Sequence, residues 1–430
     1  MYHRELIGEN LKNFSRLKGA FLAYNTNIDN IVHVDSRIER YMKGTKPEIS
    51  RRIKNEKDLF SGLLYFMKNG EAMEMPISRK VSLWLEKNMK PEQQKMGGQA
   101  GIMGNFLSSM EIPAVVYTPF LSKRQSRLFG KNVKWWKNFK HPKKNFRNDK
   151  EKINWIFEYN SGTMVRKVRA LKNGRFIAAS RPDKYEFGIK SVRKIMPKID
   201  FALLSGFQNV KNNYRRQFSC ARSVIRVLNK AGIPVHIELV ASDKKNLKHI
   251  VPLIRYADSV GLDNTELNQI IRIIHGKRCR TIEEKFSGIL KILDLGAKSV
   301  HFHYKGYFLA VRRKNYFSDP GEIKKSLEFA AASAAAEAIG DINKKKDVFS
   351  GLDVPLSAAG KREIKRLKKW LMKRGIIMKN GIGIGDYYDV IAVPNRMAKK
   401  PRDIVGLGDI VSASIFCCEN AYSKSHSDLA

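Results

Sequence analysis

From about residue 195 onward, short apolar runs alternate with helix-length segments, and this alternation restricts the fold more than any other feature of the chain. The runs comprise residues 201–206, 233–240, 258–262, 299–303 and 307–311. Strands that are joined by crossover helices pair in parallel, so the pattern predicts an α/β fold with a mostly parallel central sheet. Ligands of such sheets bind outside the carboxyl ends of the strands, and candidate site residues are therefore sought there.

A second, β-rich part is predicted between residues 111 and 194. Short β-type runs occur at residues 114–118, 155–159 and 175–178, separated by polar turns. A chain of 430 residues is long enough for one large core and a smaller unit. We therefore expect a lid laid over the main domain and assembled from separate segments. The expected boundaries are residues 1–20, 40–110 and 195–430 for the large domain, and 21–39 and 111–194 for the lid.

The sharpest local motif is the turn Gly406-Leu407-Gly408-Asp409, which leads into a stretch of small and apolar residues with helical character. Glycines let the backbone approach an anion, and the N-terminus of a helix offers unpaired N–H donors. Asp409 then stands where it could take a proton from a hydroxyl group, as phosphoryl transfer requires. On spacing alone, the better explanation of the motif is a turn in which Asp409 caps the helix.

Two acidic residues follow successive predicted strands. Glu238 lies near the end of the run at 233–240, where alternation along the strand could point it to the crevice, and Glu266 opens a helix-like segment after Gly261. Hard carboxylate oxygens are ligands for Mg²⁺, so Glu238, Glu266 and Asp409 form a candidate metal set. Taken singly, each glutamate is also explained as a surface or capping carboxylate.

Two polar clusters could hold a substrate with several hydroxyl groups. Gly98 and Gln99 lie in the glycine-rich stretch 96–102, and Asn27 and Asp29 follow a predicted strand at residues 20–24. Their amide and carboxylate groups suit sugar hydroxyls. A helix-packing glycine run and an Asx turn are the structural alternatives.

The charge of the chain raises a different hypothesis, nucleic-acid binding. The formal net charge is +40 and the isoelectric point is near 10.1, with eleven Lys or Arg against Asp149 in residues 121–150. Clustered cations bind polyphosphates, but this chain has no zinc-finger spacing or RNA-binding aromatic motif. A solvated basic surface that aids solubility or attracts anionic substrates is the alternative.

The cysteines and the apolar runs limit other classes. The four cysteines have neither a C-x-x-C pair nor ligand-like spacing to histidine, which argues against a zinc site and a disulfide framework. The first residues lack an apolar signal region, and no apolar run approaches a bilayer span. We therefore expect a cytoplasmic protein.

Taken in order, these motifs resemble the archaeal ADP-dependent sugar kinases, the phosphofructokinase and glucokinase branch of the ribokinase superfamily. The resemblance runs through residues 23–29, 96–102, 205–208, 236–238, 351–355 and 405–409. It implies a ribokinase-like three-layer sandwich closed by a smaller β-rich lid. It further implies ADP as phosphoryl donor, AMP as product and Mg²⁺ as metal.

Roles for individual residues also follow from the resemblance. It assigns Asp409 as catalytic base, Gly406 and Gly408 to the anion hole, and Glu238 and Glu266 to the metal network. The expected sugar contacts are Asn27, Asp29, Glu74, Gly98 and Gln99. Arg175 is expected near the reacting phosphates, with Arg181 as its companion, and His303 and Tyr307 near the adenine.

The sequence departs from the family pattern on both sides of the expected phosphate path. Asp263 replaces the asparagine of the N-x-x-E motif, and Ile410 replaces a threonine after the catalytic aspartate. Tyr24 and the stretch 307–310 resemble the phosphofructokinase side more closely, so we expect transfer of the ADP β-phosphate to fructose 6-phosphate. An ADP-dependent glucokinase or a bifunctional enzyme is the main alternative, and a non-catalytic nucleic-acid-binding protein on a kinase fold is the second.

Overall fold

The computed structural model describes residues 2–50, 52–71, 73–118, 120–147, 151–180, 192–399, 401–402 and 405–427. Its larger sheet has eleven strands in the order β16-β17-β18-β15-β14-β13-β12-β11-β1-β5-β6. The seven strands from β6 to β14 pair in parallel, and the remaining four extend the sheet by antiparallel pairing. The expected α/β fold with a mostly parallel sheet is confirmed.

The strands of the larger sheet are β1 (Ala20–Ala23), β5 (Ala114–Val116), β6 (Val133–Trp135), β11 (Phe201–Leu204), β12 (Val235–Glu238), β13 (Ser259–Leu262), β14 (Ser299–His303), β15 (Tyr307–Arg313), β16 (Met378–Lys379), β17 (Ile382–Ile384) and β18 (Tyr388–Pro394). A five-stranded sheet contains β3 (Met73–Pro76), β10 (Gly174–Ala179), β7 (Ile153–Tyr159), β2 (Asn27–His33) and β4 (Gln93–Gly97), in that order. A separate hairpin pairs β8 (Met164–Val165) with β9 (Val168–Arg169).

Helices cover both faces of the larger sheet and form a core on each. One core includes residues of α6 (Val192–Ile195), α7 (Tyr214–Lys230), α8 (Lys244–Ile250), α9 (Asn264–His275), α10 (Ile282–Leu293) and α12 (Ala358–Met372). The cores on the other face include residues of α1 (Tyr2–Asn13), α4 (Gln99–Ser109), α11 (Pro320–Ile339) and α13 (Leu407–Ser427). The chain also forms α2 (Glu56–Asn69), α3 (Arg79–Asn88) and the short α5 (Lys123–Ser126). The large part therefore has three layers.

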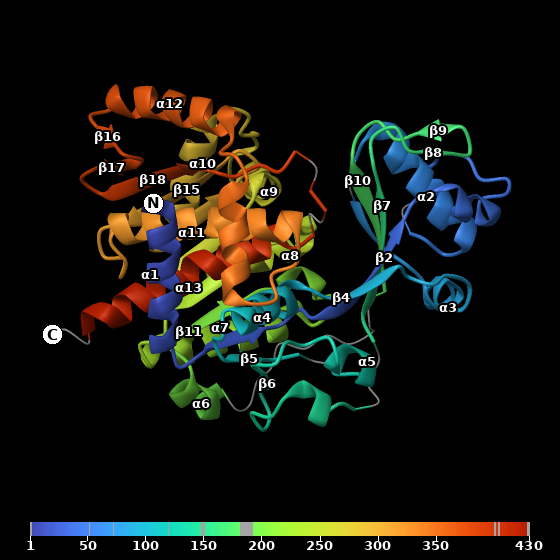
Figure 1. Ribbon diagram of the computed structural model, residues 1–430, viewed down its shortest axis with the longest axis horizontal. Coiled ribbons are helices and arrows are strands. Elements are labelled where there is room, and N and C mark those ends of the chain that lie inside the picture. Colours follow the sequence, from blue (N-terminus) through green and yellow to red (C-terminus); the bar gives the residue numbers. More distant parts are fainter. Residues whose placement is uncertain are drawn as a thin grey trace.

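The smaller sheet stands to one side of the larger one, with α2 and α3 beside it (Figure 1). Its own core contains residues of α2, α3, β7 and β10. β2 and β4 belong to this sheet, although each joins in sequence to an element of the large part: β1 precedes β2, and α4 follows β4.

The sheet membership corrects the expected lid segments 21–39 and 111–194. β1 and β5 both lie in the larger sheet, whereas β3 and β4, from the segment 40–110, lie in the smaller one. β1 and β5 are buried along their whole length, and such continuous apolar runs are typical of central parallel strands. β3 and β4 are edge strands with partly exposed, polar residues, so they give little apolar signal.

None of the helices in the described part of the chain combines the length and apolar character needed to span a lipid bilayer.

The start of α12 is fixed by close backbone packing. Gly360 lies against the turn between β14 and β15, where an added Cβ would lie 1.7 Å from the carbonyl oxygen of Gly306. Its N–H also donates to the hydroxyl of Ser357, the residue that caps the helix. A side chain at this position would push the helix away from the sheet.

We expect Gly360→Ala to lower the free energy of unfolding by about 1–3 kcal/mol, because the added methyl meets backbone that has no room to move. Gly340→Ala is the matched control, since a Cβ at Gly340 would meet nothing within 4 Å. The control should change stability by no more than about 0.5 kcal/mol. Urea unfolding followed by circular dichroism measures both. Equal stability of the two variants would contradict the packing at Gly360.

Candidate active site

The turn before α13 lies at the carboxyl edge of the parallel strands. Gly406 adopts a φ of 76°, a conformation that side chains disfavour. A Cβ at Gly408 would lie 2.8 Å from Cε1 of His303, at the end of β14, so the helix start approaches that strand closely. Asp409 is in the first turn of α13, where backbone N–H groups lack partners within the helix.

Several charged groups shift the pKa of Asp409. Burial raises the pKa of Asp409 well above its usual range, and the nearby carboxylate of Glu238 raises it further. His303 and Arg175 act in the opposite direction, and Asp29 again raises this pKa. The structure thus brings together residues from β2, β10, β12, β14 and α13. A carboxyl group with a raised pKa is a better proton acceptor when it ionises.

Glu238 ends β12 and is 4% exposed. Its two carboxylate oxygens lie 3.2 Å from Nε2 of His236 and 3.2 Å from Nε2 of His303. Nδ1 of His236 is in turn 2.7 Å from the hydroxyl of Ser259. Burial opposes ionisation of Glu238, but the two histidines outweigh it and lower its pKa to about 2. Glu238 is therefore a fixed negative charge beside Asp409.

Glu266 has a different environment from Glu238. Its carboxylate accepts the backbone N–H of Ala241 at 2.8 Å and that of Asp263 at 2.9 Å. Asp263 caps α9 in return, so the two residues form a capping box. Burial and the neighbouring Asp263 raise the pKa of Glu266 well above its usual range. Both departures from the family pattern thus have structural roles here, because Asp263 caps a helix and Ile410 is buried in the core beneath α13.

The polar residues of the smaller sheet face the same region. The Asn27 amide donates to Oδ1 of Asp29 at 2.6 Å, and both side chains pack against Gly97. Burial raises the pKa of Asp29 to about 7, partly offset by Lys152. Glu74 on β3 raises this pKa and Arg175 on β10 lowers it, which places both near Asp29.

Gln99 belongs to a hydrogen-bonded chain of side chains at the start of α4. Its Oε1 accepts from the Asn25 amide at 2.6 Å and from the Gln208 amide at 3.5 Å. Nζ of Lys152 donates to Oδ1 of Asn25 at 2.6 Å and to Oδ1 of Asn209 at 3.3 Å. Gly98 precedes α4 and packs against Asn25 and Asn27, which joins this chain of contacts to the Asp29 group.

A cavity of about 440 Å³ opens beside Asp29. Its lining includes Lys95 of β4, Ile102 of α4, Asp341 after α11 and Val405 before α13. The cavity thus lies where the smaller sheet meets the large part.

The remaining predicted residues are placed as follows. Arg175 has a buried Nη1 without a hydrogen-bond partner in the described part of the chain, and Arg181 lies outside the described residues. His303 contacts Glu238 and packs against Gly408, so it belongs to the centre of the site. Tyr307 is 1% exposed and packs against Phe302 and Tyr304 in the core, as a packing residue would.

The sequence did not single out Lys152, Asn25, Asn209 or His236 for this site. Lys152 follows the strongly basic stretch 121–150, where one more lysine gives no local signal. His236 could have been found, because it alternates with Glu238 along one strand and so points to the same face.

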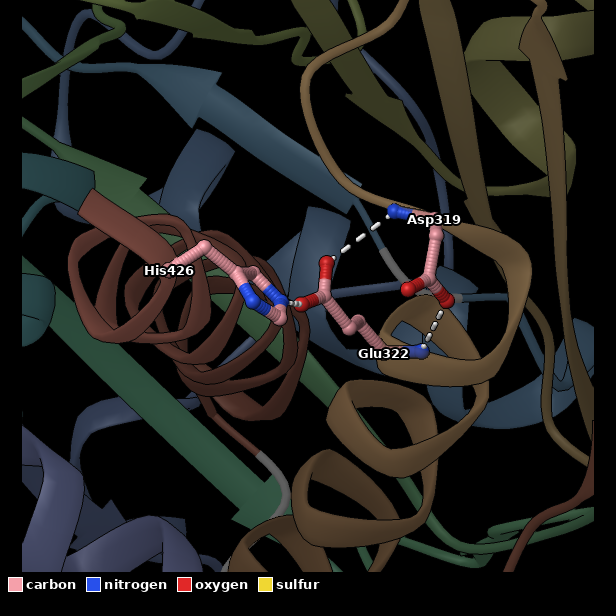
Figure 2. A group of neighbouring side chains, drawn as sticks. All are labelled: Asp319, Glu322 and His426. Atoms are coloured by element: carbon pink, nitrogen blue, oxygen red, sulfur yellow. Dashed lines mark hydrogen bonds and ion pairs between the residues drawn. The ribbon is translucent and has the colours of Figure 1, made fainter. Parts of the chain in front are cut away.

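A further group of potential metal ligands lies elsewhere, at the start of α11. The ligand atoms of Asp319, Glu322 and His426 are within 4.8 Å of one another (Figure 2). Asp319 and Glu322 form a capping box, and Nε2 of His426 lies 2.7 Å from the Glu322 carboxylate. These hydrogen bonds explain why the three residues lie together: Asp319 and Glu322 cap α11, and Glu322 also binds His426 at the end of α13. In the described residues, Glu238, Glu266 and Asp409 do not form such a close group.

The two sheets define an α/β protein. The N-terminus of α13 and several carboxylates lie together at the carboxyl edge of its parallel strands. Residues 18–418 match the family described as ADP-specific Phosphofructokinase/Glucokinase conserved region. The chain belongs to this family, in agreement with the resemblance of its motifs.

Individual relatives come from both branches. An ADP-dependent glucose/glucosamine kinase from Pyrococcus abyssi is 28% identical, over 98% of this chain and 99% of that protein. An ADP-specific phosphofructokinase from Pyrococcus furiosus is 30% identical, over 95% of this chain and 98% of that protein. A solved structure described as an ADP-dependent kinase complex with fructose-6-phosphate and ADPβS is 31% identical with a TM-score of 0.87, and 97% of each chain is covered.

The raised pKa of Asp29 makes a prediction about stability. The value of about 7 in the folded protein compares with about 3.9 for an ordinary aspartate. As the pH rises from about 4 to about 7, the unfolded chain therefore loses this proton before the folded protein does, and the folded state is weakened. Asp29→Asn removes the titration but keeps an acceptor oxygen for Asn27.

Relative to the unmodified protein, we expect this variant to gain stability across that pH range, by up to about 4 kcal/mol, and to gain no more above it. Urea unfolding at a series of pH values measures the difference. Asp386→Asn, at an exposed position, is the control for the loss of one carboxylate. A constant difference for Asp29→Asn would contradict the raised pKa.

Proposed function

We propose that the chain is an ADP-dependent 6-phosphofructokinase, which transfers the β-phosphate of ADP to the C1 hydroxyl of fructose 6-phosphate. The observation that supports this most is the position of Asp409, whose charge is coupled both to Asp29 of the smaller sheet and to Glu238 of the larger one. A base between a sugar-binding side and a phosphate-binding side is what phosphoryl transfer to a hydroxyl needs.

On this proposal the polar residues of the smaller sheet hold the sugar. Asn27, Asp29, Gly98 and Gln99 surround one region, and Glu74 acts electrostatically on it. The adjacent cavity of about 440 Å³ is of a size for a small metabolite.

The reaction follows from these positions. Asp409 accepts the proton of the C1 hydroxyl, whose oxygen forms a bond to the β-phosphorus. The bond from that phosphorus to the bridging oxygen breaks, and AMP leaves with this oxygen. The N–H groups at the start of α13, with Gly406 and Gly408, face the charge on the transferred group. Arg175, whose Nη1 is a buried donor without a partner in the described residues, adds a positive charge on the same side.

Magnesium fits this site as an ion held largely through water and substrate oxygens. Glu238 offers an ionised carboxylate, and burial is the main cause of the raised pKa values of Asp409 and Glu266, so a cation bound beside them would favour their ionised forms. These three groups do not form a close ligand cluster in the described residues, and Mg²⁺ commonly retains several waters. When bound, it would neutralise charge on the phosphates.

The preference for fructose 6-phosphate over glucose has its own support. The phosphofructokinase from Pyrococcus furiosus is 30% identical to this chain and the glucose/glucosamine kinase from Pyrococcus abyssi 28%, so identity does not separate the two branches. Lys152 is a buried cation on the sugar side, as a phosphorylated sugar would favour. Tyr24, by contrast, is fully buried, so it shapes the fold next to the site.

A coupled assay with both sugars and both donors tests the proposal. We expect turnover of fructose 6-phosphate with ADP and Mg²⁺, its loss when the cation is chelated, and its recovery when Mg²⁺ is restored. Turnover of glucose alone would assign the chain to the glucokinase side, and turnover of both sugars would make it bifunctional. Phosphorylation with ATP alone would contradict the assignment of ADP as the phosphoryl donor.

The role of Asp409 is tested by Asp409→Asn. We expect turnover to fall by a factor of about 10² to 10⁴, with sugar and nucleotide affinities retained, because the amide keeps the shape but takes no proton. Steady-state kinetics and isothermal titration calorimetry measure the two effects. Asp386→Asn serves as the control and should keep full turnover. A near-normal rate for Asp409→Asn would remove this residue from the role of base.

A further inference from the structure

A dense stretch of positive charge lies on α12 and the residues that follow it. Residues 361–379 contain nine Lys or Arg and a single acidic residue, Glu363. In Figure 1, α12 lies at the top of the large part, apart from the smaller sheet. Its cations are not among the residues assigned to the candidate active site, so they call for a separate explanation.

The helix is firmly attached to the protein through its apolar side. Leu367 and Leu371 are fully buried and belong to the same core as Met378 of β16. The cationic side chains consequently project from a fixed support. Their positions are set by the fold, so a ligand would meet them already ordered.

Three lysines form one face of this helix, which we call the lysine face: Lys361, Lys365 and Lys368. Their spacing of four and three residues places them above one another. They line a hollow of about 230 Å³ together with Asn380 and Gly381, at the turn between β16 and β17. Ile364, Met378 and Pro394 also line this hollow, so the lysines surround a partly apolar floor.

The lysine face has no internal counter-charge in the part of the chain that the structure describes. Neighbouring cations do have partners, since Arg366 bonds to Glu283 at 2.5 Å and Arg374 lies 3.5 Å over the ring of Trp370. Like charges at this spacing destabilise a helix by a few tenths of a kcal/mol per pair, about 0.2–0.5. An external anion would relieve this repulsion.

The basic stretch at 121–150 differs in this respect. Arg124 bonds to Glu151, and Lys137 lies over the rings of Trp135 and Trp136. Arg147 also lies over the ring of Trp135. Several cations of that stretch are therefore occupied within the protein, which leaves the lysine face as the better-defined anion site.

We propose that the lysine face binds the phosphates of single-stranded nucleic acid without sequence specificity. Cations spread along a helix beyond a single hollow match a chain of phosphates better than one small anion. A membrane is disfavoured because interfacial helices insert their apolar side into lipid, and here that side is packed in the core. A second copy of this chain would bring like charges together.

Fluorescence anisotropy with a labelled oligouridine RNA tests the proposal on the full chain. The test variant is Lys361→Gln/Lys365→Gln/Lys368→Gln, and the control is Lys43→Gln/Lys57→Gln/Lys68→Gln. The control lysines are exposed and lie on the side of the smaller sheet, so both variants lose the same charge. We expect the test variant to bind at least tenfold more weakly and the control less than twofold more weakly.

The dependence on salt gives a second readout. Each phosphate contact to a single strand contributes about 0.7 to the slope of log affinity against log salt, so three lost contacts should lower the slope by about 2. Sugar kinase turnover should be unchanged in both variants, since neither set belongs to the proposed site. Retained turnover also shows that the proteins are folded.

Several outcomes would overturn the proposal. Equal losses in the two variants would mean that only net charge matters. Binding to vesicles of phosphatidylglycerol that depends on the lysine face, without RNA binding, would identify a membrane contact instead. Binding of pyrophosphate alone, with no affinity for the oligouridine, would identify a small-anion site. No RNA binding at about 50 mM salt, where such contacts are strong, would leave the lysine face without this ligand.

Discussion

The burial of carboxylates where the smaller sheet meets the edge of the larger one, reinforced by repulsion at Asp409, is the constraint on which the rest of the site depends. Asp29 and Glu238 come from two different strands, and both carboxylates raise the pKa of Asp409. Two histidines lower the pKa of Glu238, whereas burial raises the pKa values of Asp29 and Asp409. Asp29 and Asp409 therefore hold a proton more tightly than an ordinary aspartate does, and a cation bound beside them would favour their ionised forms.

The neighbouring cations are placed so that they reduce this repulsion without removing it. Lys152 lowers the pKa of Asp29, but its ammonium group is committed to Asn25 and Asn209. Arg175 lowers the pKa of both Asp29 and Asp409 from β10 and keeps one donor without a partner in the described residues. Since β2 and β10 belong to the smaller sheet, two of the charges that act on Asp409 come from that sheet. The pKa of Asp409 therefore depends on how the two sheets are placed.

The sequence predicted the residues whose position depends on local pattern. Asp409 follows a glycine turn and Glu238 ends an apolar strand, and parallel topology then places both at one edge. Residues that depend on long-range register were not accessible in this way: Lys152 meets Asn25 only because β7 pairs with β2. The same limit explains β5, whose apolar run suits either sheet until its pairing with β1 is known. Glu266 shows a further limit, since a capping box and a metal ligand require the same residue types at the same spacing.

The charge is distributed unevenly: the site between the sheets is acidic, whereas the rest of the chain is basic. The site between the sheets has an excess of buried acid, although the chain as a whole carries a formal net charge of +40. Basic residues far from the site attract anions over a distance of about one Debye length, roughly 8–10 Å in physiological salt. The charges that shift the pKa of Asp409 most come from Glu238, His303, Asp29 and Arg175, none of which lies on α12, so the role proposed for the α12 cations is a local one. A local role requires a ligand that contacts them directly, which is why the ordered lysines of α12, rather than the total charge, point to an anionic partner.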